Sequence, residues 1–226
     1  LAASQLVYGE VRKGGVKTFH ETTGNNKFYH YFLTLAHHEV HAIPTIYVND
    51  DVATLDATGY VTSQSWSSKI LIKKFLGTDN QNIHDTLTGT ANTPTEITNA
   101  FKGQGVACLY IRLEYDADVF QNGMPDISAV VQGKKVYDPR KDNTSSSYDA
   151  SLGVTTHRID TATTWQYSSN PALALADYLR DTKGCKSPSS EIDYSMVATA
   201  ADDCASIGAV GVTAVSYTHL TLPTKR

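Results

Sequence analysis

The sequence predicts an α+β fold that is mainly β: an antiparallel β-rich domain followed by the start of a helical hub unit. Short segments that alternate apolar and polar residues, separated by Gly, Asn and Pro, run through residues 6–137, which is typical of antiparallel strands. A stretch rich in Ser, Thr and Asp then covers residues 141–170. Beyond Asn170 the apolar residues recur at the spacing of a helix.

The composition describes a folded protein and excludes several classes. Of the 226 residues, 41% are hydrophobic and 19% are charged, with a formal net charge of −4, so the chain is neither disordered nor basic enough to predict nucleic-acid binding. No apolar run approaches the about 20 residues that span a membrane. Cys108, Cys185 and Cys204 form no C-x-x-C pair, which fits a chain folded in a reducing cytoplasm.

The first strands are delimited by turn residues. Gly14-Gly15 and Gly24-Asn25-Asn26 mark turns, and the segment 27–36 carries aromatic residues on both faces, so we expect it to be covered on both sides. Residues 56–59 predict a hairpin turn, and Pro44 places a strand predicted at 40–48 at a sheet edge or a bulge. The remaining strands of this part are expected at residues 6–11, 16–23, 52–55, 60–62 and 68–76.

The clearest strand is predicted at residues 106–115, where Leu109 and Ile111 share an apolar face. Residues 127–137 predict the next strand. We expect these two strands to be adjacent in the main sheet, with Leu109 and Ile111 buried between its layers.

Two helical segments are expected. A short helix is predicted at 96–102, whereas the polar residues 77–95 before it have few apolar anchors. Asn170 is a good helix cap and Pro171 a good first helical residue, and Gly184 is expected to end the helix. The apolar residues of this helix are Leu173, Leu175, Ala176 and Leu179.

A further helix is expected after Ser190, which with Asp193 resembles a capping box that carries Asp in the usual Glu position. Its expected apolar stripe repeats every four residues. The stripe consists of Ile192, Met196, Ala200 and Cys204.

These patterns predict the domain organisation. Residues 1–140 form a β-rich domain, residues 141–170 a polar connection, and residues 171–207 the two-helix start of a further domain that is cut off. Residues 216–226 resemble a translated sequencing-adapter tail, so we expect them to be foreign to the fold.

Several residue groups could carry chemistry, and each departs from the pattern that its chemistry needs. A zinc protease has H-E-x-x-H on a helix, but the residue four positions after His38 is Ala42, and the segment around His41 joins two strands. We therefore expect a polar turn at residues 37–41. Gly133-Lys134-Lys135 lacks the first Gly and the final Ser or Thr of a phosphate-binding loop.

The carboxylates and cysteines give no stronger signal. Glu114, Asp116 and Asp118 alternate as calcium ligands can, but the EF-hand spacing is absent, and a solvated strand end is expected instead. Cys108 lies in a strand and Cys204 on a helical stripe, where both are expected to be small buried residues. The sequence therefore predicts no enzyme, and no catalytic, cofactor-binding or metal-binding residue.

Long phrases of the sequence resemble the tip attachment protein J family of phage tail proteins. They are FKGQGVACLYIRLEYD at residues 101–116, NGMPDISAVVQGKKVYDPR at 122–140 and SNPALALADYLRD at 169–181, with the shorter VYGEVRKGG at 7–15 and IYVND at 46–50. The phrases follow one another in the family's order, and the resemblance extends over nearly all of residues 1–207.

The resemblance implies a structural part of a bacteriophage virion. The family, also called host specificity protein, forms a homotrimeric baseplate hub at the tail tip of lambda-like phages and acts in tail assembly and host attachment. It implies other tail-tip proteins and the tape-measure protein as partners, assembly in the host bacterial cytoplasm, and contact with a host cell-surface receptor through a distal part that these residues do not include.

Two other functions stay open at the level of sequence. A β-sandwich module that binds carbohydrate or a receptor would show exposed aromatic platforms on a monomer. A tail-associated cell-wall hydrolase would bring carboxylates or a metal together in a deep cleft.

The adapter-like tail gives a first testable prediction. Deleting residues 216–226 should leave the melting temperature of the expressed chain unchanged, because these residues were never selected with the fold. A loss of several degrees would show that they pack as part of a domain.

Overall fold

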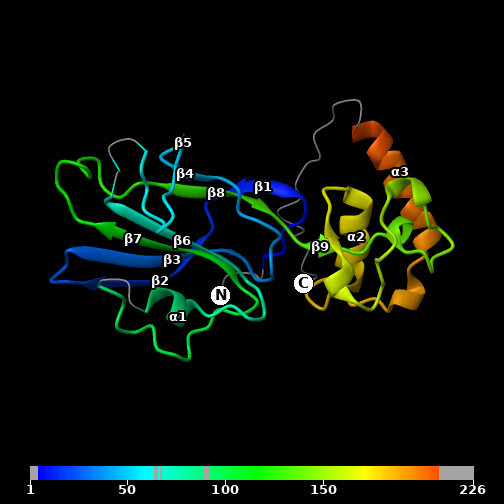
Figure 1. The fold of residues 1–226 in the computed structure, drawn as a ribbon, viewed down its shortest axis with the longest axis horizontal. Helices are drawn as coiled ribbons and strands as arrows, with labels where there is room; N and C mark the ends of the chain where they lie inside the picture. The colour runs from blue at the N-terminus through cyan, green and yellow to red at the C-terminus, as the bar shows by residue number, and fades with distance from the viewer. Residues whose placement is uncertain (1–4, 64–65, 67, 89–91, 209–226) are drawn as a thin grey trace, which may run out of the picture. The chain divides into compact units, whose positions relative to one another are not determined.

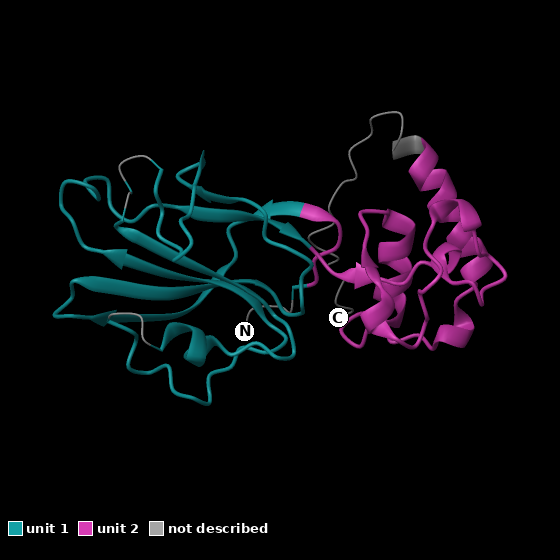
Figure 2. Ribbon diagram, viewed as in Figure 1, with its two compact units in different colours: residues 1–5, 11–132 teal, residues 6–10, 133–226 magenta. Residues whose placement is uncertain are grey.

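The computed structural model describes residues 5–63, 66, 68–88 and 92–208, and its α+β fold is mainly β, as predicted (Figure 1). The chain divides into two compact units (Figure 2): unit 1 contains Leu1–Gln5 and Val11–Gln132, and unit 2 contains Leu6–Glu10 and Gly133–Arg226. The expected domain limits at 140 and 170 stay predictions. Residues 216–226 lie outside the described residues.

The larger sheet of unit 1 has the strand order β2-β3-β7-β6. Its strands are β2 (Val16–Thr23), β3 (Phe28–Ala36), β7 (Ala107–Glu114) and β6 (Ile70–Leu76), and their pairing is antiparallel. All but one residue of β3 and of β7 are buried, which confirms the cover on both sides that was expected for residues 27–36 and shows the same for β7. The β2–β3 turn forms as predicted, with Gly24, Asn25 and Asn26 in the left-handed region.

A second sheet lies along one side of the first (Figure 1), and its strand order is β1-β8-β4-β5. It contains β1 (Glu10–Lys13), β8 (Ile127–Gln132), β4 (Ile46–Val48) and β5 (Asp51–Val52). Along β8 every second residue is buried, so this strand covers the larger sheet with one face only. The β1 strand leads to β2 in the other sheet through Gly15, whose φ of +68° and contact with Thr34 O leave no room for a Cβ.

The expected pairing of the strands at 106–115 and 127–137 was wrong. β7 lies between β3 and β6, and β8 lies between β1 and β4, in the other sheet. Both edges of β7 are occupied by long strands, so the chain has to leave this sheet before β8 begins. The burial of Leu109 and Ile111 was predicted correctly.

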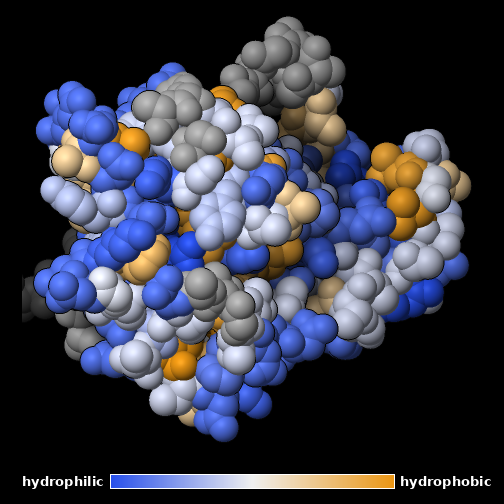
Figure 3. Space-filling model, turned by 60° about the vertical axis from the view of Figure 1, so that its left-hand side comes forward, coloured by the Kyte–Doolittle hydropathy of each residue, from blue (hydrophilic) through white to orange (hydrophobic). Residues whose placement is uncertain are grey.

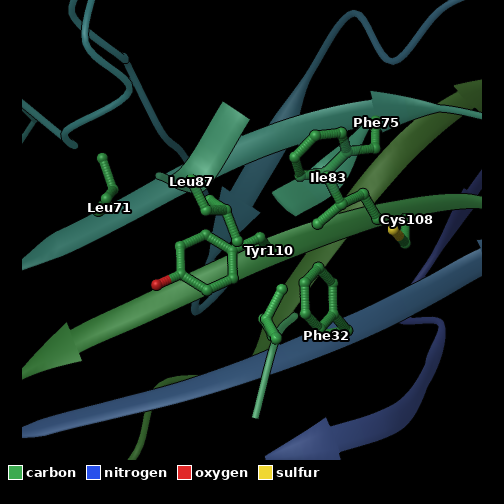
Figure 4. Packing of buried hydrophobic residues seen from close by; sticks show 8 residues of the cluster. Phe32, Leu71, Phe75, Ile83, Leu87, Cys108 and Tyr110 are labelled. Carbon is green, nitrogen blue, oxygen red and sulfur yellow. The ribbon is translucent and has the colours of Figure 1, made fainter. Parts of the chain in front are cut away.

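The first helix lies earlier than expected. Residues 96–102 form bends and turns, in which the amides of Thr95 and Glu96 donate to the Glu21 carboxylate. Helix α1 (Ile83–Leu87) forms instead within the polar stretch, with Asn82 accepting from the Asp85 amide at its start. Figure 4 shows Ile83 and Leu87 among the sheet residues Phe32, Cys108 and Tyr110 in one apolar cluster.

Residues 40–62 follow the sequence pattern in part. The strand expected at 40–48 is shortened to Ile46–Val48, and before Pro44 only an isolated bridge joins Ala42 to Gln132. The hairpin at 52–62 is confirmed by the bridge between Leu55 and Val61. The Asp56 carboxylate closes its turn by accepting from the amides of Thr58 and Tyr60.

Unit 2 contains a two-stranded sheet of β9 (Lys135–Val136) and β10 (Gln166–Tyr167), together with two α-helices. Helix α2 (Pro171–Arg180) begins as predicted, because the Asn170 side chain accepts from the amides of Ala172 and Leu173. It ends at Arg180 rather than at Gly184. Single 3-10 turns lie at Pro139–Lys141, Ala150–Leu152, Ala162–Thr164 and Ser189–Glu191.

Helix α3 (Tyr194–Gly208) starts and faces differently from the expectation. Ser190 lies in a 3-10 turn, and Asp193 caps the helix by accepting from the amides of Ser195 and Met196. Met196 is 65% exposed, whereas Ala198 and Ala201 are buried, so the expected four-residue stripe was wrong. The small alanines let α3 approach closely, and the longer Met side chain remains in solvent.

The position of Leu109 gives a prediction for stability. Leu109→Ala should lower the free energy of unfolding by about 2–5 kcal/mol, because Leu109 is fully buried in β7. Urea unfolding measures this change. Leu175→Ala is the matched control, since Leu175 is 57% exposed in α2, and it should change the free energy by less than about 0.5 kcal/mol. An equally small change for Leu109→Ala would contradict the core assignment.

Candidate binding surface

A hollow of about 400 Å³ lies at one end of unit 1, where the β4–β5 turn, Trp66 and the loop between β7 and β8 meet. We call it the loop-end hollow. Figure 3 looks towards this end of the unit, where hydrophilic residues predominate and apolar ones form small separate patches. The hollow is lined by Asn49, Trp66, Asp118, Val119, Gln121, Asn122, Gly123 and Met124.

Backbone hydrogen bonds hold the walls of the loop-end hollow. Asn49 and Asp126 exchange two bonds of 2.8 Å, one between their backbones and one from the Asp126 amide to the Asn49 side-chain oxygen. Two turns shape the loop, since the Phe120 amide donates to Asp116 O and the Gly123 amide to Phe120 O. The ring of Phe120 packs against that of Trp66, with their centroids 5.7 Å apart.

The alternating carboxylates before the hollow are neutralised by lysines. Lys69 Nζ lies 3.6 Å from Glu114 and 3.1 Å from Asp116, and Lys27 lies 3.1 Å from Glu114. Partial burial alone would raise the pKa of Glu114, but its hydrogen bond with Lys27 and the charge of Lys69 lower it. The hydrogen bond from Lys69 likewise lowers the pKa of Asp116. These two carboxylates are therefore ion-paired, while Asp118 is exposed.

The histidine segment at 37–41 is a turn and not a helix. The Gln5 amide donates to His37 Nδ1, and the amide of His37 donates to Gln5 O. The Nδ1 atom of His38 lies 2.6 Å from Glu39 O, and the His41 amide donates to Gln132 O. The Nδ1 atoms of His37 and His38 thus contact backbone groups, and the segment ties strands together.

Lys134, from the segment that resembles a phosphate loop, belongs to an ion-pair cluster in unit 2. Its Nζ lies 2.6 Å from Asp177 and 2.5 Å from Asp181, both on or next to α2. The Tyr8 hydroxyl donates to the same Asp177 at 2.7 Å. Burial together with the charge of Asp177 raises the pKa of Tyr8, so Tyr8 remains a neutral donor. We call these four residues the Lys134 cluster.

The cysteines take different positions. Cys108 is buried in β7, and burial raises the pKa of its thiol to about 12, so it is a structural residue, as the sequence suggested. Cys204 is half-buried on α3, and Cys185 is exposed. All three are free thiols.

A buried polar network in unit 1 gave no signal in the sequence. On the α1 side of the larger sheet, His30 is hydrogen-bonded through Nδ1 to the Tyr110 hydroxyl at 2.7 Å and through Nε2 to the Thr23 hydroxyl at 2.8 Å. The neighbouring Arg112 donates to the Tyr60 hydroxyl at 2.6 Å. His30 and Arg112 are both buried. A search for alternating patterns assigns these positions to a strand but does not show that polar groups meet there.

The described residues contain no group of three His, Cys, Asp or Glu side chains that could hold a metal ion. Among the same residues, no helix has the length and apolar character of a membrane span.

The His30 network predicts how stability depends on pH. Burial and the charge of Arg112 lower the pKa of His30 from 6.5 to about 4, against a smaller opposite effect of Glu21. Between about pH 4 and pH 6.5, His30 is therefore protonated in the unfolded chain but neutral in the folded chain. The free energy of unfolding should fall as the pH decreases from 6.5 towards 4.

Urea unfolding at several pH values tests this dependence. His30→Gln should flatten the slope by at most one proton's contribution, about 1.4 kcal/mol per pH unit. Part of the slope should remain, because burial also lowers the pKa of His157. An unchanged slope in His30→Gln would contradict the prediction.

The comparisons with known proteins give little. No protein-family model matches the chain, and no curated protein matches it. Among solved structures, a chain described as "Virion of native gene transfer agent (GTA) particle" aligns with 58% of this chain at 14% identity and a TM-score of 0.35. The aligned part spans about a quarter of that chain, 26%. A likeness of this size supports neither a common fold nor a common function.

Proposed function

We propose that this chain is a structural component of a bacteriophage tail tip, part of a baseplate hub or host specificity protein that acts in tail assembly and host attachment. It works by assembly with copies of itself and with other tail proteins, not by catalysis. The proposal rests on the phrases that resemble the tip attachment protein J family and on the positions that these phrases take in the fold.

The observation that carries the proposal is the resemblance of five phrases in the family's order, and three of these phrases meet in unit 2. Lys134 comes from the phrase at 122–140, Asp177 and Asp181 come from the phrase at 169–181, and Tyr8 comes from the phrase at 7–15. All four residues meet in the Lys134 cluster. These three phrases are therefore packed parts of one unit.

Backbone contacts join the same phrases. The amides of Gly133 and Lys134 donate to the carbonyl oxygens of Gly9 and Val7. Gly133 has no space for a side chain, because an added Cβ would lie 2.1 Å from Val7 O. In unit 1, Ile46 pairs with Ala129, which joins the phrase at 46–50 to the phrase at 122–140. The resembling phrases therefore include β7 and most of the second sheet in unit 1, together with β9 and α2 in unit 2.

Localisation in purified virions tests the proposal. Particles of the phage that encodes this chain should bind antibodies raised against residues 5–208 at one end of the tail, as seen by gold labelling and electron microscopy. Pre-immune antibodies are the control. Particles that bind no antibody, or that bind it along the whole tail or on the head, would contradict the tail-tip proposal.

A variant of the intact gene tests whether the role is structural. His38, His41 and Asp116 belong to the near-motifs of the sequence and do not line the loop-end hollow, and changing all three to Asn removes that chemistry. Tails should still form and infect, provided that the purified variant keeps the melting temperature of the original chain. Normal tails that fail to infect would show that one of these side chains has a chemical task.

A further inference from the structure

The loop-end hollow of unit 1 combines side chains that differ from those of the packed core. Its lining includes one tryptophan, Trp66, together with three amide side chains and one carboxylate, from Asn49, Gln121, Asn122 and Asp118. An indole offers an apolar face that can stack on the C–H groups of a sugar ring. Amides and carboxylates provide paired donors and acceptors for neighbouring hydroxyls. This combination matches the two kinds of surface that a pyranose presents.

The indole packs on a second aromatic ring. Trp66 is half-buried, and its ring packs on Phe120 at 5.7 Å with an angle of 40° between the planes. Phe120 is itself held by turn hydrogen bonds on both sides of the loop. A supported ring loses little conformational freedom when a ligand stacks on it, so less of the binding free energy is lost.

The polar side chains are partly oriented before any ligand arrives. The side-chain oxygen of Asn49 accepts from the Asp126 amide, and this bond fixes the direction of the Asn49 amide nitrogen. Within the part of the chain that the structure describes, no lysine or arginine forms an ion pair with Asp118 or Asp126. The hollow therefore has negative charge nearby, which favours hydroxyl donors and disfavours anionic sugars.

The size of the hollow suits a small ligand. Its volume of about 400 Å³ falls within the range of about 300–1,000 Å³ that is usual for small-molecule sites. We propose that the loop-end hollow binds a neutral hexopyranose unit of a glycan, with Trp66 as the stacking residue and Asp118 and Gln121 as hydroxyl partners. This site does not depend on the tail-tip role, and either proposal can fail while the other holds.

Titration of the full chain with single sugars tests the proposal. The probes are the methyl glycosides of glucose, galactose, mannose and N-acetylglucosamine, with glucuronic acid as the anionic comparison. Trp165→Phe leaves Trp66 as the single tryptophan, so its fluorescence reports on the hollow. At least one neutral glycoside should give a saturable change with a Kd of about 1 mM, as expected for one ring bound at a shallow site, and glucuronic acid should give none.

Variants identify the residues involved, with ligand-observed NMR as the readout because it needs no tryptophan. Trp66→Ala and Gln121→Ala should each weaken binding, the former by about tenfold or more. Asp118→Asn should admit glucuronic acid. Tyr115→Ala is the matched control, because Tyr115 is a 68% exposed aromatic residue that does not line the hollow, and it should bind like the original chain.

Two results would overturn the proposal. One is the absence of saturable binding for every neutral glycoside. The other is binding that survives Trp66→Ala and Gln121→Ala in full, which would place the sugar elsewhere. If Trp66→Ala does not fold, as judged by circular dichroism, Gln121→Ala decides the question alone, because its side chain is exposed in the loop.

Discussion

Unit 1 depends on one constraint, which is that β7 is apolar or aromatic on both faces and must be covered on both. Tyr110 and Cys108 face α1, while Leu109 and Ile111 are buried on the other side of the sheet. Long strands pair with β7 at its two edges, so only separate elements can cover its faces. The second sheet covers one face, and α1 with the segment around Ile97 covers the other. The loops that connect the two sheets and α1 are long because the chain has to cross between these layers.

Unit 2 is organised by charges more than by apolar area. Its apolar cluster is small, with Val136, Leu173 and Ala201 at its centre. Around it, Arg140 forms a two-pronged pair with Asp138 and a third contact with Asp202. The Lys134 cluster joins the residue before β9 to Asp177 of α2 and to Asp181. Buried ion pairs contribute little net stability compared with apolar packing, but a partner left alone is costly. Such pairs therefore fix the arrangement of the segments.

The sequence predicted where turns, strands and caps lie better than which strands pair with each other. Turns at Gly24-Asn25-Asn26 and around Asp56, and the cap at Asn170, depend on local chemistry and were correct. The neighbour of β7 was missed, because pairing between distant strands leaves no local pattern. Helix α1 was missed because its five residues show little periodicity. The helix expected at 96–102 does not form, and the carboxylate of Glu21 in β2 instead accepts from the amides of Thr95 and Glu96.

The motifs found in the sequence and the candidate site found in the structure lie in different places. His38 and His41 were correctly expected to lie in a turn, while Asp116 is bound by Lys69, a contact that the spacing of carboxylates cannot show. The loop-end hollow gathers Asn49, Trp66 and Gln121 from three separate segments. Its polar loop residues look like ordinary turn residues in the sequence, and only the fold brings them beside an indole ring.

Unit 2 is discontinuous, and this affects how the chain folds during synthesis. Residues 6–10 leave the ribosome before residues 11–132, and their partners at 133–134 follow only after those residues have been made. At about 5–20 residues per second, this delay lasts several seconds. Residues 11–132 of unit 1 thus lie in the sequence between two parts of unit 2. If unit 1 folds first, it shortens the effective loop between the two parts and so lowers the entropic cost of joining them.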